Sequence, residues 1–216
     1  MSFEIRVLTL GIAATNCYIV SDGATGEAVL IDPVDQPELL LKTLRDNNLT
    51  LKLILATHGH FDHVLASAAL KEATGVPFYI HHDDVRWLDR LPEQGLRFTG
   101  TPFPKAAVPD RLLTDEQETI TVGGITFKTL FTPGHSPGHI AYWWPDAHLV
   151  FSGDALFQGS IGRTDLPGAD HATLIRSIFD KLLSLGDDTQ VLPGHGEATT
   201  IGAERRSNPF LQQPSE

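Results

Sequence analysis

Several residue types and patterns are scarce in this chain of 216 residues. A single cysteine, Cys17, excludes an internal disulfide and is compatible with a reducing compartment. Because it lies in the predicted strand 16–20, we expect a buried, unreactive thiol. No apolar run approaches the roughly 18 residues that a bilayer-spanning helix needs. The first residues also lack the basic and apolar stretches of a secretion signal, so we expect a cytoplasmic protein without membrane contacts.

Positive charge is scarce as well. The chain has 16 Lys and Arg residues against 27 Asp and Glu residues, which gives a formal net charge of −11. A nucleic-acid-binding surface needs clustered cations facing phosphates, so this balance argues against a nucleic-acid partner. A small anionic substrate needs only one or two local cations and stays compatible with it. The charge does not specify an oligomeric state.

The chain does have the composition of a globular protein, with 41% hydrophobic and 20% charged residues. Its length suits one substantial core, and we find no linker or internal repeat. We therefore predict a single domain over residues 1–216.

Apolar patterns and turn residues predict many short elements. The expected strands are 3–10, 16–20, 27–31, 51–56, 77–81, 118–122, 125–131, 140–144, 148–152 and 190–192. The expected helices are 35–48, 64–74, 170–183 and 202–207, with Asp35 and Asp170 as N-caps. Residues 90–110 hold four prolines and are expected to form an irregular loop. This order favours a sandwich of two mixed sheets with helices outside.

Three imidazoles and a carboxylate occupy the six residues from His58 to His63, between a predicted strand and a predicted helix. His58 and His60 alternate by two and so project to the same side of the chain. Asp62 and His63 lie where the helix begins and can turn toward a neighbouring point. Two ligand pairs aimed at adjacent points suit a pair of close cations. A capping aspartate among surface histidines is the structural alternative.

Three later segments also end an apolar strand with one metal-competent side chain. These side chains are His135, Asp154 and His195, and a glycine directly precedes each of them. Nitrogen and carboxylate ligands without a thiolate favour zinc, and iron or manganese also fit. His139 follows His135 by four residues, and we expect it to support a ligand or the fold rather than to bind metal.

The segment Thr57-His58-Gly59-His60-Phe61-Asp62-His63 resembles the T-H-x-H-x-D-H signature of the metallo-β-lactamase superfamily, and the three later segments match its other ligand motifs in order. The run from Gly153 to Arg163 resembles the glyoxalase II branch. The whole chain, including the tail Glu204–Leu211, is similar to the short, single-domain bacterial kind. The resemblance implies an α/β fold, the αββα sandwich of two mixed sheets flanked by helices, without a C-terminal helical substrate domain.

The resemblance also implies a site for two divalent metal ions, with zinc expected. The implied ligands are His58, His60 and His135 for the first ion, and Asp62, His63 and His195 for the second, with Asp154 bridging the two. Asp62 and Asp154 are the implied catalytic residues, because they place the water that the metals activate. Arg163 stands where the glyoxalase II pattern has a cation for the glutathione carboxylate. An ion pair between Arg163 and Asp165 is the alternative.

The activity implied is hydrolysis of S-D-lactoylglutathione, or of a related acyl-glutathione thioester, to the acid and glutathione. Such a hydrolase takes part in methylglyoxal detoxification, and its partner is the small-molecule thioester. This chain departs from the longer glyoxalase II enzymes at Asp165 and Glu197, where those have tyrosines. These departures leave the identity of the substrate open.

Other activities of the same fold stay as alternatives. Persulfide dioxygenases use one iron and share the segment Gly162-Arg163-Thr164-Asp165, but usually have alanine and an acidic residue around the last histidine. This chain has Gly194 and Gly196 there. β-Lactamase, lactonase and RNA-processing activities are less favoured by the motifs. A metal-binding module without catalysis is a further alternative. All seven ligand positions are intact, which argues against it.

Overall fold

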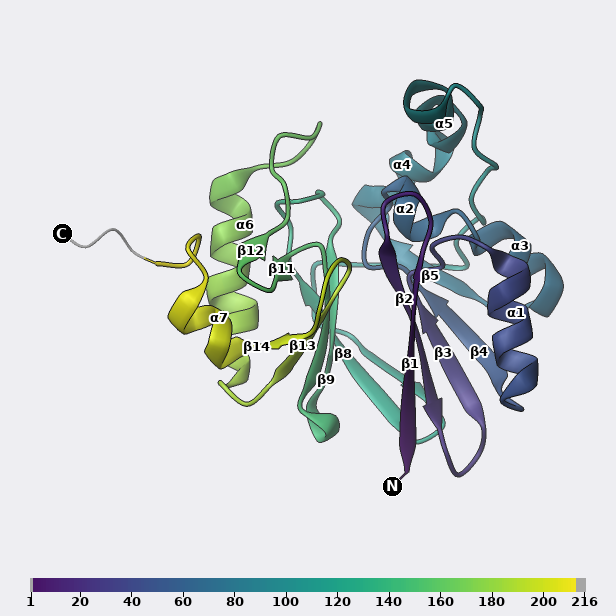
Figure 1. Ribbon diagram of the computed structural model, residues 1–216, viewed down its shortest axis with the longest axis horizontal. Helices are drawn as coiled ribbons and strands as arrows, with labels where there is room; N and C mark the ends of the chain where they lie inside the picture. The colour runs from purple at the N-terminus through teal and green to yellow at the C-terminus, as the bar shows by residue number, and fades with distance from the viewer. Residues whose placement is uncertain (1, 213–216) are drawn as a thin grey trace. The chain divides into compact units, whose positions relative to one another are not determined.

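The computed structural model describes residues 2–212, and the chain divides into two compact units (Figure 1). The first unit holds the residues up to Leu113 and Thr121–Ile125, and the second holds Thr114–Ile120 and the residues from Thr126 onward. Each unit has its own buried hydrophobic cluster. None of the helices in this part of the chain has the length and apolar character required to cross a bilayer. A single domain over residues 1–216 stays a prediction.

The first unit is built on a six-stranded mixed sheet. Its strands, in spatial order, are β1 (Phe3–Leu10), β2 (Thr15–Asp22), β3 (Glu27–Ile31), β4 (Thr50–Leu55), β5 (Phe78–His81) and β6 (Arg111–Leu113). The pairs β1–β2 and β2–β3 are antiparallel, and β3, β4, β5 and β6 run parallel to one another. β2 is buried along its whole length, as expected for a strand inside a sheet. Cys17 is fully buried there, and burial raises the pKa of its thiol.

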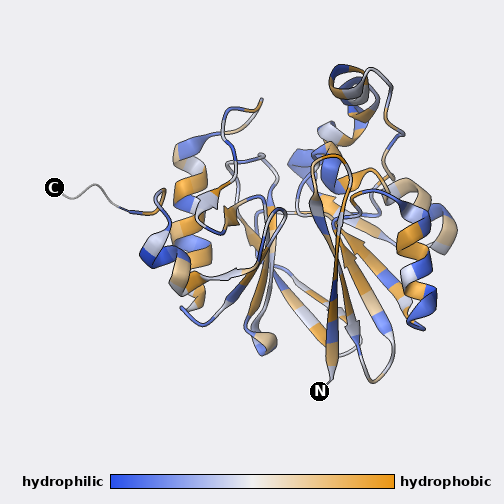
Figure 2. Cartoon of the chain, viewed as in Figure 1, coloured by the Kyte–Doolittle hydropathy of each residue, from blue (hydrophilic) through white to orange (hydrophobic). Residues whose placement is uncertain are grey.

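The helices of this unit are α1 (Pro37–Asp46), α2 (Phe61–Val64), α3 (Ser67–Thr74), α4 (Val85–Asp89) and α5 (Leu91–Thr99), with a 3₁₀ turn η1 (His82–Asp84). In Figure 1, α1 and α3 lie next to each other beside the strands. Leu40 and Leu44 form the buried stripe of α1, and Figure 2 shows the hydrophilic residues on its other faces.

Three expectations for this unit are wrong. Asp35 does not cap α1: Gln36 is the N-cap, in a left-handed conformation, and Asp35 instead accepts a hydrogen bond from the backbone N–H of Gln36. Residues 90–110 are not one loop, because α5 occupies 91–99, with Pro92 tolerated in its first turn and Gly100 ending it at φ 76°. The helix expected at 64–74 is divided into α2 and α3.

The second six-stranded sheet is also mixed. Its spatial order is β14 (Thr199–Thr200), β13 (Gln190–Pro193), β10 (Leu149–Gly153), β9 (Ile140–Trp144), β8 (Ile125–Phe131) and β7 (Thr119–Val122). β10 and β13 are parallel, while β13–β14, β9–β10 and β8–β9 are antiparallel. A small hairpin, β11 (Leu156–Phe157) and β12 (Ser160–Ile161), follows β10.

The second unit, as far as the structure describes it, has two α-helices, α6 and α7, and a 3₁₀ turn, η2 (Pro145–Ala147), between β9 and β10. α6 (His171–Ser177) continues through a π-helical turn, Ile178–Leu182, into a 3₁₀ turn, Leu183–Leu185, and α7 (Ile201–Ser207) follows β14. The predicted cap at Asp170 is confirmed, because its side chain accepts a 2.7 Å hydrogen bond from Thr173 N–H. The two mixed sheets, each with its own helices, are the elements that the sequence predicts.

Candidate metal centre

Four predicted ligands gather in the first unit, between the end of β4 and the start of α3. The ring centroid of His58 lies 4.6 Å from that of His60 and 4.1 Å from that of His63. Asp62 and His63 belong to α2, and Asp62 Oδ2 lies 3.7 Å from His63 Nε2. His58 and His63 are fully buried. The segment therefore brings its three imidazoles and its carboxylate into one cluster, as the spacing predicts.

A buried carboxylate fixes the orientation of two of these imidazoles. Asp32, which follows β3, accepts hydrogen bonds from His63 Nδ1 at 2.8 Å and from Thr57 Oγ1 at 2.9 Å through Oδ2, and from Thr57 N–H at 2.7 Å through Oδ1. The Thr57 hydroxyl gives its one hydrogen to Asp32, so it accepts from His58 Nδ1 at 3.0 Å. Both histidines thus carry their hydrogen on Nδ1, and Nε2 is the nitrogen that would bind a metal.

A second buried carboxylate holds the backbone between His58 and His60. Asp84 is fully buried, and its Oδ2 accepts a 2.8 Å hydrogen bond from Gly59 N–H. A Cβ atom at Gly59 would lie 2.6 Å from the carbonyl oxygen of Asp84, so no larger residue fits without a backbone shift. The glycine between the two histidines is therefore required by the close approach of η1.

The second unit carries the other three predicted ligands, each just after a strand. His135 follows β8, Asp154 follows β10 and His195 follows β13. Asp154 Oδ2 lies 3.5 Å from His135 Nε2 and 3.4 Å from His195 Nε2. One carboxylate oxygen thus faces two imidazole nitrogens, which is the relation expected of a bridging ligand between two cations.

Backbone contacts fix these side chains as well. His135 Nδ1 donates to the carbonyl oxygen of Arg163 at 2.9 Å, which leaves Nε2 as its metal-binding nitrogen. Asp154 N–H donates to His139 Nε2 at 3.0 Å, and His139 Nδ1 therefore donates to Thr132 Oγ1 at 2.8 Å. His139 is fully buried and supports Asp154, in line with the role expected from its spacing.

Arg163 forms an ion pair with Asp165, which was the alternative to a contact with the substrate carboxylate. Its Nε and Nη2 donate to the two carboxylate oxygens of Asp165 at 2.8 and 2.7 Å. Both side chains are largely exposed, at 62% and 70%. The guanidinium holds the pKa of Asp165 at about 2, so this carboxylate is charged at any physiological pH.

Sequence reasoning missed the supporting residues Asp32, Thr57 and Asp84. Asp32 has the same signal as the predicted ligands, a polar side chain directly after the apolar strand β3. Asp84 carries no comparable signal, because its partner Gly59 lies 25 residues away in the chain.

The donor set fits divalent cations. Histidine nitrogens and carboxylate oxygens are the ligands found at metal sites of hydrolases. Hydrogen bonds to Nδ1 also orient His58, His63 and His135, as is usual for histidines that bind metal through Nε2. The seven predicted ligands fall into two groups, four in the first unit and three in the second. The two mixed sheets and this donor set are those of a metal-binding protein of the kind that carries out hydrolysis.

Comparison with known proteins identifies the family. The model of the metallo-β-lactamase superfamily matches residues 10–195, so the chain belongs to that superfamily. It is 43% identical to the hydroxyacylglutathione hydrolase GloC of Haemophilus influenzae, over 98% of this chain and 100% of that protein. The chain is a metallo-hydrolase of this superfamily, and the predicted fold class is confirmed.

Two solved structures are similar over nearly the whole chain. The B3 metallo-β-lactamase BLEG-1 is 43% identical, with a TM-score of 0.91, over 97% of this chain and 100% of that one. TTHA1623 in a di-iron-bound form is 46% identical, with a TM-score of 0.85, over 95% of this chain and 100% of that one. The names of these relatives differ in activity and metal, so membership in the superfamily does not by itself specify a substrate.

Proposed function

We propose that this metallo-hydrolase cleaves glutathione thioesters, S-D-lactoylglutathione or a related acyl-glutathione, to the acid and glutathione. The observation that carries the proposal is the position of Asp154 Oδ2, within 3.5 Å of Nε2 of both His135 and His195. The family resemblance assigns these two histidines to different metal ions, so the oxygen between them suits a two-metal hydrolytic site. The similarity to a hydroxyacylglutathione hydrolase supports the choice of substrate.

The proposed site holds two divalent ions, with zinc first and iron or manganese as alternatives. The proposed ligands are His58, His60 and His135 for one ion, and Asp62, His63 and His195 for the other, with Asp154 shared. The di-iron form of a similar protein supports the count of two ions and keeps iron as a candidate. The supports at Asp32 and at the Arg163 carbonyl suit this arrangement, because they present Nε2 of His58, His63 and His135.

Two divalent ions bound there would lower the pKa of water and favour negative charge on the thioester carbonyl oxygen. Asp62 orients the attacking water, and its Oδ2 is itself held by a hydrogen bond from Thr15 Oγ1 at 3.1 Å. His139 fixes the backbone of Asp154 and so the direction of its carboxylate. The leaving thiol has an ordinary pKa of about 8.5 and departs as a thiolate without a strong general acid.

The test uses metal-loaded protein and three measurements: metal content, thioester hydrolysis and oxygen consumption with glutathione persulfide. We expect two ions per chain, hydrolysis, and no oxygen consumption. One iron per chain with oxygen consumption would replace the proposal with the dioxygenase alternative. Two ions without turnover of any thioester would leave a metal-binding module. The cytoplasmic location stays a prediction.

Substitution of Asp154 sharpens this test. Asp154→Asn should reduce kcat by at least about 100-fold, because the neutral amide cannot bridge two cations. Asp146→Asn is the matched control, since Asp146 is an exposed aspartate of the same unit. Equal activity in the two variants would show that Asp154 is outside the reacting centre.

A further inference from the structure

Trp87 of α4 is a buried side chain with an unpaired hydrogen-bond donor. The residue is 9% exposed. Its indole N–H, at Nε1, has no hydrogen-bond partner among the described residues 2–212. A buried indole N–H usually has a partner, because leaving a buried donor unpaired costs free energy. A ligand that carries an acceptor oxygen would supply this partner.

Helices α4 and α5 lie against the segment that carries four of the proposed metal ligands. In Figure 1, α4 lies beside α2, and α5 lies beyond α4. The ring centroid of Trp87 is 5.9 Å from that of His60, and a Cβ atom at Gly59 would lie 3.1 Å from Trp87 Cβ. Phe61 packs on Phe98 of α5, with ring centroids 5.3 Å apart. The indole of Trp87 therefore adjoins a proposed metal ligand.

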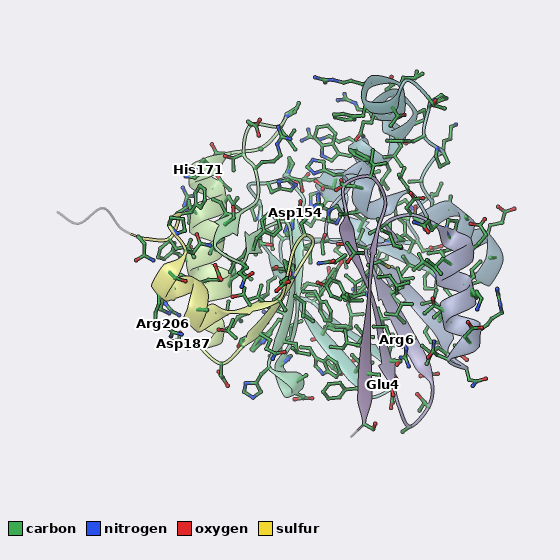
Figure 3. The ribbon with its side chains drawn as sticks, viewed as in Figure 1. Glu4, Arg6, Asp154, His171, Asp187 and Arg206 are labelled. Atoms are coloured by element: carbon green, nitrogen blue, oxygen red, sulfur yellow. The ribbon has the colours of Figure 1, made fainter. Side chains whose placement is uncertain are left out.

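Two arginine side chains lie over the Trp87 ring. The guanidinium carbons of Arg86 and Arg90 are 4.9 and 5.8 Å from the ring centroid. Both side chains are exposed, and neither forms an ion pair within the part of the chain that the structure describes, although Asp89 lies in the same helix. Elsewhere arginines pair with carboxylates, and Figure 3 shows two of these pairs: Arg6 with Glu4, and Arg206 with Asp187. The two guanidiniums beside Trp87 thus have donors available for a carboxylate from outside.

These three groups suit one carboxylate. An indole N–H and two guanidiniums donate hydrogen bonds and accept none, so their common ligand is an acceptor, and the guanidiniums favour a negatively charged one. Arg163, the cation that the glyoxalase II pattern provides for the glutathione carboxylate, belongs to the second unit. A carboxylate bound by α4 therefore belongs to the other half of the thioester, the acyl group.

We propose that Trp87, Arg86 and Arg90 bind the carboxylate of an acidic acyl group, so that the preferred substrate is a dicarboxylic acid joined to glutathione through one of its carboxyl groups. This inference rests on the proposed function and narrows its substrate class. Trp87 Nε1–H donates to the bound carboxylate, and the two exposed guanidiniums turn from the ring toward it. Trp87 is then a specificity-determining residue, because an acyl group without an acceptor leaves its buried N–H unpaired.

Steady-state kinetics of the zinc-loaded protein on two thioesters tests the preference. S-Adipoylglutathione carries a terminal carboxylate, and S-hexanoylglutathione has the same chain length without it. We expect kcat/KM to be about tenfold higher for the adipoyl thioester, as for one charge-assisted hydrogen bond. Trp87→Phe keeps an aromatic ring and removes the N–H, so it should bring this ratio close to one. Trp143→Phe is the matched control, because Trp143 also has a cation over its ring, Lys128 Nζ at 5.3 Å, and belongs to the second unit.

The arginines are tested on the same ratio. Arg86→Ala and Arg90→Ala should each lower it by about threefold, a smaller effect because both guanidiniums are exposed. Arg45→Ala is the matched control, since Arg45 is an exposed arginine of α1 in the same unit, and it should keep the ratio of the unmodified protein. A ratio near one in the unmodified protein, or equal ratios in Trp87→Phe and Trp143→Phe, overturns the inference.

The indole N–H itself reports binding, because zinc-loaded protein is diamagnetic and suits NMR. S-(ω-Carboxypentyl)glutathione and S-hexylglutathione are thioethers that cannot be hydrolysed. Of the indole signals from the three tryptophans, the one missing in Trp87→Phe belongs to Trp87. We expect the carboxylate thioether to shift this signal downfield, as a new hydrogen bond does, and the hexyl thioether to leave it near its original position. A signal that the carboxylate thioether does not move, as for an indole paired only with a buried water, overturns the inference.

Calorimetric titration with the same thioethers keeps the inference separate from the proposed function. We expect the carboxylate thioether to bind about tenfold more tightly than the hexyl thioether, and this difference to disappear in Trp87→Phe, whether or not any thioester is turned over. Loss of turnover with this binding pattern intact refutes the proposed function alone. Hydrolysis of both thioesters without this binding pattern refutes the carboxylate site alone.

Discussion

Asp32→Asn is the sharpest perturbation of the metal centre that the structure offers. The carboxylate accepts three buried hydrogen bonds, two through Oδ2 and one through Oδ1. An asparagine has one oxygen, so in either orientation its NH₂ group faces at least one donor that it cannot serve. The loss of one buried hydrogen bond to a charged group costs about 1–3 kcal/mol of stability. The Nδ1 hydrogen of His63 also loses its charged acceptor, and such outer partners are worth roughly 10- to 100-fold in metal affinity.

The assays separate these two effects. Metal affinity is measured by competition with a chromogenic chelator, and the free energy of unfolding of the metal-free protein by urea titration. We expect Asp32→Asn to lower both.

Asp22→Asn provides the matched control for stability. Asp22 is also buried in the first unit, at 8% exposure, and its two oxygens accept from Ala24 N–H and Gly124 N–H at 2.8 and 2.9 Å. Its loss should destabilise the protein by a similar amount and leave metal affinity unchanged. If the two variants bind metal with equal affinity, Asp32 does not orient a ligand and the assignment of Nε2 as the binding nitrogen is wrong.

Three further predictions follow from single contacts. Gly162→Ala should give little folded protein, because its Cβ would lie 1.8 Å from a backbone oxygen. Gly159→Ala carries only the strain of a positive φ of 67°, with no atom within 4 Å of its Cβ, and should still fold; circular dichroism distinguishes the two variants. Cys17 is fully buried and should react with a thiol reagent at pH 8 only in urea; fast labelling without urea would contradict this. The free energy of unfolding should fall above about pH 8.5, because the thiol ionises there in the unfolded chain, whereas burial raises its pKa in the folded protein. Chelation of bound metal should lower Tm by several degrees, because a ligand at 100 times its Kd stabilises the folded state by about 2.7 kcal/mol, and an unchanged Tm would mean that no structural metal is bound.

The sequence indicates the candidate metal ligands more directly than it indicates the residues that hold these ligands in place. His58, His60, Asp62 and His63 form a dense local pattern, and its spacing alone places them together. The supports come from other strands and turns, so their partners are set by sheet pairing rather than by local sequence. Asp32 reaches His63 because β3 and β4 are parallel neighbours, which no window of the sequence shows.

Helix boundaries were harder to predict for a related reason. Proline and glycine are both frequent in loops, so Pro92 and Gly100 favour a loop when only composition is considered. Pro92 lies in the first turn of α5 and Gly100 at its C-terminus, and both positions are compatible with a helix. The pattern 90–110 therefore reads as a loop although Leu91 and Gly95 are buried within a helix. Gly95 packs so closely on Phe103 that a Cβ atom would lie 2.2 Å from its backbone nitrogen, and this tertiary contact is invisible in the sequence.

The predicted metal ligands depend on buried partners that come from other elements of the fold. Asp32, Asp84 and His139 are buried, and each holds a predicted ligand or the backbone beside it. Because these partners belong to the scaffold, they place no restriction on the substrate, in keeping with relatives of 43% identity that are named for a hydroxyacylglutathione hydrolase and for a β-lactamase.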